Sequence, residues 1–471
     1  MLWKSKRLIW DTRQNITGKD EIVFLRKHLS TAQKEDLKQL ANKFGIDELI
    51  DENNHSKSFG DIVAEAHQFP DHHLKVIGIT GTNGKSTTVA ILCFLLKELG
   101  YRVLELGTLG SAIHEPASSA SINYTETGFT TPDTPILFDI LFQAKKLSVD
   151  FVVMEVSSHA ISLGRIDGLN FDAAGFSNLS QDHLDFHKSM ESYQEAKRSL
   201  FSHYLEKSKK EKKVGVVNTF GSSGEEFYTP LKSLKVDIVK SSRLQVESWS
   251  QSVNGLKLKI KNKPLLTYNM LGLHNVENLL LAVNIIEKLE KREIDFNKID
   301  FKQFSGVPGR LEKIGQGSPY VWVDYAHTPE ALERSIQTLK ENCLDNSKIG
   351  VVFGCGGDRD QTKRPKMADV VSSLADWTVL TNDNPRTEDA MKIAKDISAG
   401  FRRGFDFEIE LDRKTAIQKA LKKMKSDDLL IVAGKGHEEY QIIGGQKRFF
   451  SDREVIRAVS YTHLTLPTIG C

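Results

Sequence analysis

The chain has 471 residues, the length of two to four ordinary domains, and its 39% hydrophobic residues are enough to build packed cores. Lys and Arg number 64 against 62 Asp and Glu, so the net charge of +2 gives no reason to expect a nucleic-acid or membrane partner. The four cysteines have no C-x-x-C spacing and predict reduced thiols in a cytoplasmic protein, with neither a disulfide framework nor a zinc site.

Residues 1 to about 75 are polar and show a mostly helical pattern, with apolar residues at helix spacing in "KEDLKQLANKFGIDELI". The β-rich run "LKVIGIT" then precedes a glycine-rich turn and the helix "TTVAILCFLLKELG", which Gly100 ends. Further short strands alternate with helical stretches: "YRVLELG", "VDFVVMEV", "FDAAGFSNL" and "KVGVVNT". This alternation predicts a mostly parallel sheet of βαβ units.

The Gly- and Pro-rich segment "FSGVPGRLE" (304–312) predicts a domain hinge. A second series of strands follows, each ending in a turn rich in Gly, Asp or Asn: "YVWVDYA", "KIGVVFGCGG", "DWTVLTND" and "DLLIVAGKG". Ligands of open α/β sheets bind at such strand ends. We therefore expect domains at 1–70, 71–305 and 306–460, followed by a non-native tail at 461–471, whose sequence lacks the periodicity of the preceding helix.

The stretch "GITGTNGKSTT" (78–88) departs from the common phosphate-loop template because Ile79 stands where the first glycine is usual. Its position between a strand and a helix still predicts a phosphate site built from backbone N–H groups. Lys85 would reach the β- and γ-phosphates, and the Ser86 hydroxyl would bind Mg²⁺. The alternative is a tight strand–helix turn with an exposed lysine.

Two later motifs carry groups that bind metals. Glu155, in "MEVSSHAISLGR", follows a buried strand, where a carboxylate is costly unless a cation such as Mg²⁺ accompanies it. The alternative is a capping or salt-bridged Glu. His183 and His187, in "SNLSQDHLDFH", are spaced to share a helix face, but no further ligand is spaced for zinc.

These stretches resemble the Mur ligase family, the ATP-dependent amide-forming enzymes of peptidoglycan assembly. That family writes its loop T-G-T-N/K-G-K-[ST]-[ST], and its N-x-x-x-D-H-x-D-x-H and Y-x-x-x-K-x-x-L-F motifs match 178–187 and "YQEAKRSLF" (193–201). The resemblance covers roughly residues 65 to 459. It implies a three-domain α/β architecture with a central P-loop ATPase domain, a Rossmann-like C-terminal domain and an atypical, short UDP-binding-like N-terminal domain, where "DTRQ" (11–14) is a faint match to the family's D-S-R.

The resemblance implies ATP and two Mg²⁺ ions as cofactors, and it implies that Lys197 carries a CO₂-derived carbamate. Without it, Lys197 is predicted to be a solvated helix lysine. The implied catalytic residues are Lys85, Glu155, His183 and Lys197. The implied metal ligands are Ser86, Glu155, His183 and carbamylated Lys197. The implied ATP-binding residues are Gly81, Thr82, Asn83, Gly84, Lys85, Ser86, Thr87, Asn278, Arg310, Asp324 and His327.

Alternatives exist for several of these positions. Asn275, three residues before Asn278, suits a helix N-cap, and Arg310 and Asp324 suit surface ion pairs. The resemblance also points to UDP-dipeptide ligands at Thr130, Thr131, Ser157 and Arg165, although "TTPDT" (130–134) suits a helix cap equally well.

The motif "DNPR" (383–386) resembles the branch of the family that adds meso-diaminopimelate as the third peptide residue. A guanidinium at Arg386 would grip the far carboxylate of diaminopimelate and repel the ammonium of lysine. The alternative is a turn with a surface arginine. The implied amino-acid ligands are Arg359, Asp383, Asn384, Arg386, Gly434 and Glu438.

The expected function is ATP-dependent addition of meso-diaminopimelate to UDP-N-acetylmuramoyl-L-alanyl-D-glutamate through an acyl phosphate, by a cytoplasmic monomer without membrane insertion or nucleic acid. The alternatives are a ligase with another acceptor, of the lysine-adding or folylpolyglutamate type, and a P-loop ATPase switch that joins nothing.

Overall fold

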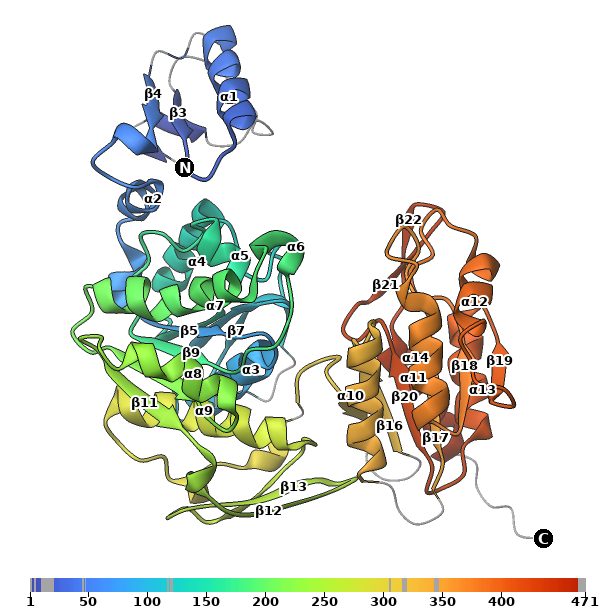
Figure 1. Cartoon of the computed structure of the whole chain (residues 1–471). Helices are drawn as coiled ribbons and strands as arrows, with labels where there is room; N and C mark the ends of the chain where they lie inside the picture. The colour runs from blue at the N-terminus through green and yellow to red at the C-terminus, as the bar shows by residue number, and fades with distance from the viewer. Residues whose placement is uncertain are drawn as a thin grey trace. The chain divides into compact units, whose positions relative to one another are not determined.

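A computed structural model of the chain describes residues 2–3, 6–9, 21–44, 46, 48–116, 118, 122–304, 306–315, 320–342 and 347–464 (Figure 1). The chain divides into two compact units: unit 1 comprises Met1–Val246 and His274–Ile299, and unit 2 comprises Glu247–Leu273 and Asp300–Cys471. No helix of the described residues has both the length and the apolar character that a membrane span requires.

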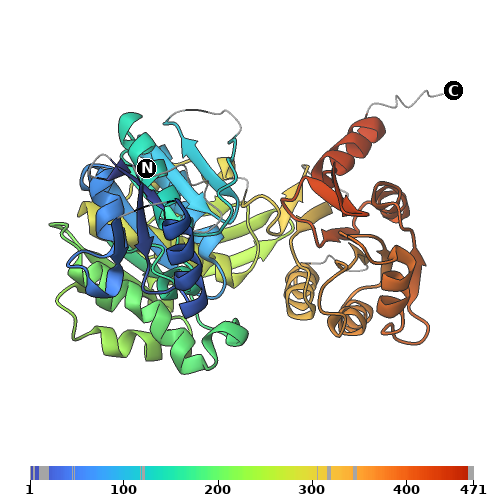
Figure 2. The ribbon, with the colours of Figure 1, turned by 90° about the horizontal axis from the view of Figure 1, so that it is seen from above.

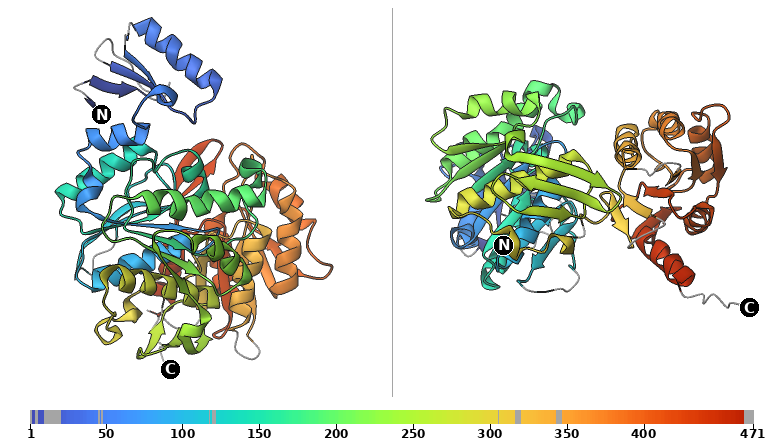
Figure 3. Two further views of the ribbon diagram at one scale, coloured as in Figure 1. Left: turned by 60° about the vertical axis from the view of Figure 1, so that its left-hand side comes forward. Right: turned by 90° about the horizontal axis from the view of Figure 1, so that it is seen from below.

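The N-terminal segment holds a small sheet of order β1-β2-β3-β4, formed by β1 (Leu2–Trp3), β2 (Lys6–Ile9), β3 (Glu21–Leu25) and β4 (Glu48–Asp51). The helical prediction for this segment did not include this sheet, although α1 (Thr31–Phe44) does form and lies against the strands in Figure 3. The reason lies in β3, where Val23 and Leu25 pack on α1 while Ile22 and Phe24 enter the neighbouring core. The "DTRQ" motif lies outside the described residues.

The central sheet of unit 1 has the order β11-β10-β9-β5-β8-β6-β7. Its pairs are parallel except β6–β7, which confirms the predicted mostly parallel sheet. The strands are β5 (Lys75–Thr80), β6 (Val103–Gly107), β7 (Gly110–His114), β8 (Phe151–Glu155), β9 (Ala173–Phe176), β10 (Val214–Asn218) and β11 (Asp237–Ser241).

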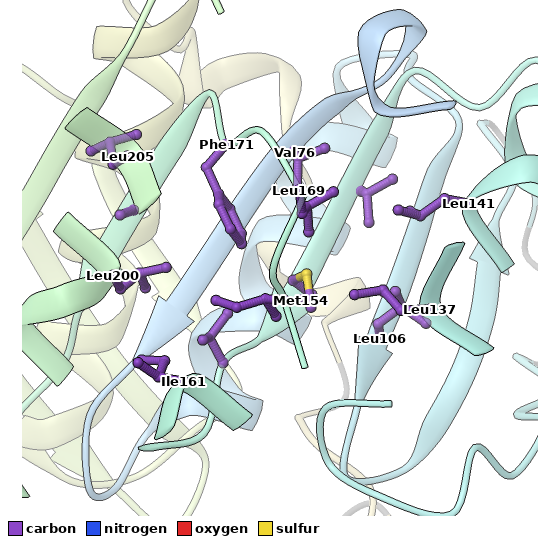
Figure 4. Packing of buried hydrophobic residues seen from close by; sticks show 14 of the residues in the cluster. Val76, Leu106, Leu137, Leu141, Met154, Ile161, Leu169, Phe171, Leu200 and Leu205 are labelled. Carbon is purple, nitrogen blue, oxygen red and sulfur yellow. The ribbon is translucent and has the colours of Figure 1, made fainter. Parts of the chain in front are cut away.

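Helices cover this sheet and bury its strands. They are α2 (Phe59–Ala66), α3 (Lys85–Glu98), α4 (Thr134–Lys146), α5 (Ser158–Ser162), α6 (Leu184–His187), α7 (Met190–Ser199), the π-helix η3 (Leu200–Leu205), α8 (Ser222–Leu231) and α9 (Leu273–Glu290). Short 3₁₀ turns are η1 (Glu52–Asn54), η2 (Pro70–His73), η4 (Arg243–Gln245), η5 (Phe296–Lys298) and η6 (Phe301–Gln303). Figure 4 shows Val76 of β5, Met154 of β8 and Leu106 of β6 packed together with Leu137 and Leu141 of α4, all fully buried. This packing fixes the strand ends that carry the candidate site.

Unit 2 contains a three-stranded sheet that the sequence did not predict: β12 (Val246–Ser252), β13 (Gly255–Ile260) and β14 (Leu265–Tyr268). Its main sheet has the order β15-β16-β20-β17-β18-β19. These strands are β15 (Glu312–Ile314), β16 (Tyr320–Asp324), β17 (Ile349–Phe353), β18 (Trp377–Leu380), β19 (Asp406–Ile409) and β20 (Leu429–Ala433). All its pairs are parallel except β15–β16. The hairpin of β21 (Tyr440–Ile443) and β22 (Gln446–Phe449) follows.

Side chains alternate between the two faces of this main sheet. Val351 and Ile431 pack in one core with α10 (Pro329–Lys340), α11 (Lys363–Leu374) and α12 (Ala390–Ser398). Val352 and Leu430 pack in a second core with α13 (Arg413–Lys423) and α14 (Asp452–Leu464). Figure 2 shows these orange-to-red helices around the strands. Helices on both faces of a mostly parallel sheet confirm the Rossmann-like prediction. Helix α14 continues past residue 460, where the tail was predicted to begin, and residues 465–471 lie outside the described part.

Candidate active site

The glycine-rich turn between β5 and α3 forms the centre of the candidate site in unit 1. Gly81 and Gly84 have φ angles of 145° and 80°, which glycine adopts without a Cβ clash. Helix α3 begins at Lys85, and the N–H groups of a helix's first turn have no acceptor within the helix, which favours an anion at this end. The Nζ of Lys85 donates to the carbonyl oxygens of Gly81 (3.0 Å) and Thr82 (2.9 Å). Lys85 is thus half-buried against the loop, unlike the exposed lysine of the alternative interpretation.

The segment that follows β9 holds this loop in place. Ser177 Oγ donates to the Asn83 carbonyl oxygen (2.6 Å), and Asn178 Oδ1 accepts from the Asn83 N–H (3.0 Å). A Cβ at Gly81 would lie 1.9 Å from Ser177 Oγ, so this position requires glycine. The sequence analysis missed Ser177 and Asn178 as site residues. Their place directly after a predicted parallel strand was the available signal.

Asn278 of α9 borders the other side of the loop. Its Oδ1 accepts from Thr88 Oγ1 (3.2 Å), and a Cβ at Gly84 would lie only 2.6 Å from the same oxygen. Its Nδ2 donates to Asn275 Oδ1 (3.1 Å). Because α9 begins at Leu273, Asn275 lies inside the helix and is not its N-cap.

Lys197 of α7 is only 1% exposed, which excludes the alternative of a solvated helix lysine. Its Nζ donates to the Gly81 carbonyl oxygen (2.8 Å), the same atom that accepts from Lys85, and lies 4.2 Å from the centre of the Tyr193 ring. Burial, together with repulsion by the Lys85 ammonium, lowers the pKa of Lys197 from 10.5 to about 6. A neutral amine at this depth is nucleophilic. The π-helix η3 begins three residues later, and such turns are frequent at functional sites.

Glu155 ends β8 and is 2% exposed. Its Oε1 accepts from the N–H of Thr108 (2.8 Å), and a Cβ at Gly107 would lie 2.5 Å from that oxygen. Among the described residues, no Lys, Arg or His forms an ion pair with Glu155, so the salt-bridged alternative does not hold. A buried carboxylate without a cation fits Mg²⁺, which prefers oxygen ligands. Half-buried Ser86 would supply the hydroxyl ligand from the start of α3.

The four residues expected at the UDP-dipeptide lie together beside Glu155. Thr131 Oγ1 donates to the Glu155 carbonyl oxygen (2.9 Å) and accepts from the N–H of Ser157 (3.1 Å). Thr130 shares a hydrogen bond with Thr108 (3.2 Å), which the sequence analysis did not identify. Arg165 Nη1 donates to the Thr131 carbonyl oxygen (3.4 Å). Within "TTPDT", the residue that caps a helix is Asp133, the N-cap of α4.

The two histidines of "DHLDFH" lie one helical turn apart, because the N–H of His187 donates to the carbonyl oxygen of His183 (2.9 Å), and both rings face Tyr193, at 6.1 and 5.1 Å between centroids. His183 precedes the short helix α6 with a φ of 51° and has a side chain that is 46% exposed, whereas His187 is buried with Nε2 2.9 Å from Ser158 Oγ. Both rings contact His159, at 4.7 and 5.6 Å between centroids. Among the described residues, the ring nitrogens of His183 and His187 do not belong to any cluster of three possible metal ligands. The zinc alternative for these two histidines is therefore not supported.

In unit 2, Arg310, Asp324 and His327 surround Tyr325. The Arg310 guanidinium lies 5.1 Å from the Tyr325 ring centre, and His327 Nδ1 lies 2.8 Å from the Tyr325 carbonyl oxygen. Asp324 accepts from the N–H groups of Leu311 (2.6 Å) and Ala326 (2.7 Å). Burial raises the pKa of Asp324 to about 6. Asp324 is thus a buried acceptor and not one partner of a surface ion pair.

The residues expected at the amino acid also lie together in unit 2. Asn384 and Glu438 are joined by a hydrogen bond of 3.0 Å, and the fully buried Lys435 donates to both (3.2 and 3.0 Å). Lys435 is a residue that the sequence analysis did not select, although it stands in "AGKGHEEYQ". A Cβ at Gly434 would lie 2.4 Å from Asp383 Oδ2, which places these two residues in contact.

Arg386 belongs to the same group. It has a φ of 54°, and its backbone N–H donates to the Ile442 carbonyl oxygen (3.0 Å). Its Nη1 donates to the Gly357 carbonyl oxygen (2.7 Å), so the loop that carries the exposed Arg359 lies against it. Hydrogen bonds therefore hold both the backbone and the side chain of Arg386 in place. A surface arginine on a turn would have a side chain free in solvent.

Comparison with known proteins gives matches over most of the chain. The family model of the Mur ligase middle domain matches residues 79–286, and that of the Mur ligase glutamate ligase domain matches residues 309–436. A UDP-N-acetylmuramoyl-L-alanyl-D-glutamate–2,6-diaminopimelate ligase of Bacillus cereus is 38% identical over 82% of this chain and 78% of its own length.

Solved structures also resemble the chain. A UDP-N-acetylmuramoyl-L-alanyl-D-glutamate–2,6-diaminopimelate ligase superposes with a TM-score of 0.69 and 28% identity over 98% of this chain and 95% of its own. A bifunctional folylpolyglutamate synthase/dihydrofolate synthase with Mn, AMPPNP and L-glutamate bound gives a TM-score of 0.58 at 20% identity, over 85% of this chain and 93% of its own. The second likeness supports the fold alone.

Proposed function

The chain belongs to the Mur ligase family, and from this premise we propose that it is the ATP-dependent ligase that adds meso-diaminopimelate to UDP-N-acetylmuramoyl-L-alanyl-D-glutamate in peptidoglycan synthesis. The observation that supports diaminopimelate as the acceptor amino acid is the position of Arg386. A planar guanidinium pairs bidentately with a carboxylate, and diaminopimelate has a second carboxylate at its far end where lysine has only an ammonium.

The surroundings of Arg386 suit a zwitterionic amino acid. Glu438 supplies a carboxylate for an ammonium, and the Asn384 amide offers both donors and acceptors. Buried Lys435 holds these two side chains together through its own hydrogen bonds. Arg359, Asp383 and Gly434 complete the proposed amino-acid site, as the family pattern assigns them.

The proposed reaction has two steps. The D-glutamate carboxylate oxygen attacks the γ-phosphorus of ATP, ADP leaves, and an acyl phosphate forms. The amine of diaminopimelate then attacks the acyl carbon, phosphate leaves, and the amine loses a proton as the amide forms. The backbone N–H groups at the start of α3 and the Lys85 ammonium stabilise the negative charge of the β- and γ-phosphates.

Ser86, Glu155, His183 and a carbamylated Lys197 are the proposed holders of two Mg²⁺ ions, which when bound neutralise charge between the phosphates and the carboxylate. The neutral amine of Lys197 can attack CO₂, forming an N–C bond and releasing a proton. The resulting carbamate is a carboxylate on a long stem, and it adds negative oxygen ligands for a cation near the Lys85 ammonium.

The remaining contacts follow the family pattern. Thr130, Thr131, Ser157 and Arg165 would bind the UDP-dipeptide, and the last supplies a guanidinium for its acidic groups. The proposed nucleotide ligands are Gly81, Thr82, Asn83, Gly84, Thr87, Asn278, Arg310, Asp324 and His327. The proposal places the enzyme in the cytoplasm as a monomer.

The test is ADP release with UDP-N-acetylmuramoyl-L-alanyl-D-glutamate as substrate, with either meso-diaminopimelate or L-lysine as acceptor. We expect turnover with diaminopimelate and a tripeptide product of the corresponding mass. Turnover with lysine alone would overturn the acceptor assignment. ATP hydrolysis that neither acceptor accelerates would favour a switch that joins nothing.

A further inference from the structure

Three side chains that can bind metals meet in a buried cluster apart from the proposed active site. Cys93 lies on α3, about two helical turns after Lys85, Glu105 lies on β6, and His114 lies on β7. The thiol sulfur, a carboxylate oxygen and an imidazole nitrogen all lie within 4.8 Å of one another. Their exposed fractions are 0%, 3% and 6%.

The fold explains why these residues meet although they are distant in sequence. His114 pairs with Val103 in the antiparallel β6–β7 ladder, so Glu105, two residues along, projects from the same face of the sheet. Helix α3 packs against β6 and places Cys93 over that face. His114 Nε2 lies 2.7 Å from Glu105 Oε2, and Tyr124 Oη donates to the same oxygen (3.0 Å). Among the described residues, the Cys93 thiol makes no hydrogen bond.

We propose that Cys93, Glu105 and His114 form a binding site for a divalent transition-metal ion, with zinc as the best fit. Thiolate sulfur, imidazole nitrogen and carboxylate oxygen are the zinc ligands of proteins, and a thiolate disfavours Mg²⁺ and Ca²⁺. The charges balance, because one thiolate and one carboxylate neutralise a +2 ion and leave no net charge in the core. Water would supply the fourth ligand.

Metal binding replaces the present hydrogen bonds by coordination. The Cys93 thiol loses its proton to solvent, and the histidine binds through Nε2, the nitrogen that now faces Glu105. Tyr124 remains a donor to the Glu105 carboxylate and thereby orients a metal ligand from outside the coordination shell.

The site would connect α3 with the β6–β7 hairpin. That hairpin turns at Thr108 and Leu109, and the Thr108 N–H donates to Glu155, a proposed Mg²⁺ ligand. A metal at the cluster would thus fix one wall of the proposed active site without contacting its substrates. The proposed ligase reaction does not require this metal, so the failure of either proposal leaves the other standing.

The probe is Co²⁺ added to the full chain after removal of metals by a chelator. A thiolate bound to cobalt gives a near-ultraviolet charge-transfer band, and a tetrahedral site gives intense visible d–d bands, whereas cobalt at the proposed oxygen-rich Mg²⁺ site gives no thiolate band. We expect one thiolate-bound cobalt per chain, displaced by one equivalent of Zn²⁺. Absence of the thiolate band from the wild-type chain would overturn the proposal without any variant.

Variants identify the ligands. A chain with the substitutions C343S, C355S and C471S retains Cys93 as its single cysteine and should keep the band. Cys93→Ser should abolish it, and His114→Gln should weaken cobalt binding by more than about a hundredfold, since even changes outside the coordination shell cost 10–100-fold. A band that persists in Cys93→Ser, or an unchanged affinity in His114→Gln, would show that the cluster is only a buried ion-pair network.

Discussion

Replacing Lys197 by Met tests whether the fold holds this lysine neutral. Methionine keeps a long unbranched side chain inside the core but cannot titrate. Burial and the neighbouring Lys85 ammonium lower the pKa of Lys197 to about 6, whereas the unfolded chain has the ordinary value of 10.5. Between these two values the unfolded chain holds a proton that the folded chain lacks.

The sign and the size of the effect follow from this difference. Because the unfolded state binds more protons, the free energy of unfolding of the wild-type chain rises with pH in this window, by about 1.4 kcal/mol per pH unit. From pH 7 to pH 9, Lys197 should contribute an increase of about 3 kcal/mol, and the Lys197→Met chain should lack it. Other titrating groups affect both chains equally and cancel in the comparison.

Urea unfolding at pH 7, 8 and 9 measures the effect, in buffers freed of divalent metal and CO₂ so that neither a bound ion nor a carbamate contributes. Lys212→Met is the matched control because Lys212 is exposed and should leave the wild-type pH dependence unchanged. If the Lys197→Met chain gained stability with pH as steeply as the wild type, Lys197 would not be neutral in the fold, and the route to its carbamate would lose its support.

Two further substitutions test unit 2. Arg386→Lys should raise the KM for diaminopimelate by about 10- to 100-fold, because a bidentate charged pair becomes a single contact, with the KM for ATP unchanged in the ADP-release assay; an unchanged diaminopimelate KM would contradict the acceptor assignment. Glu438→Gln should lower the free energy of unfolding by about 3 kcal/mol in urea, because it leaves buried Lys435 without its anion. The control is the neighbouring Glu439→Gln, at a 54% exposed side chain, which should cost less than about 1 kcal/mol.

The sequence predicted the parts of the fold that have a regular pattern. Short apolar strands alternating with helices predicted both parallel sheets, and the left-handed Gly100 ends α3 as expected. The N-terminal sheet escaped prediction because "EIVFL" is apolar on both faces and shows no alternation. The β12–β14 sheet was missed because β12, "VESWSQS", is largely polar, although "GLKLKI" of β13 shows the apolar–polar alternation of a strand.

The candidate site residues that the sequence could indicate are those that the chain carries in a continuous motif. Lys85, Lys197 and Arg386 stand in such motifs, and the structure places each against the loop that the motif implies. Ser177 hydrogen-bonds Asn83 of the phosphate loop, and Lys435 hydrogen-bonds Asn384 and Glu438. The sequence signal for both was only their place just after a predicted strand. The cluster of Cys93, Glu105 and His114 could not be predicted from sequence spacing at all. The cysteine spacing argued against a zinc site, whereas the β6–β7 register places a histidine and a glutamate beside one thiol.

The packing of the central sheet explains why the phosphate loop has Ile79 in place of the usual first glycine. Ile79, which occupies the position of the usual first glycine, is a fully buried residue of β5 whose neighbours along the sheet are Glu155 and Gly175. Its side chain fills the space that Gly175 leaves, since a Cβ there would lie 2.6 Å from Ile79 Cδ1. The strand therefore extends to Thr80, and the turn begins at Gly81, where Ser177 approaches too closely for any side chain. The glycine that the common template places at 79 is needed two residues later, because the strand is longer and the segment after β9 takes part in forming the loop.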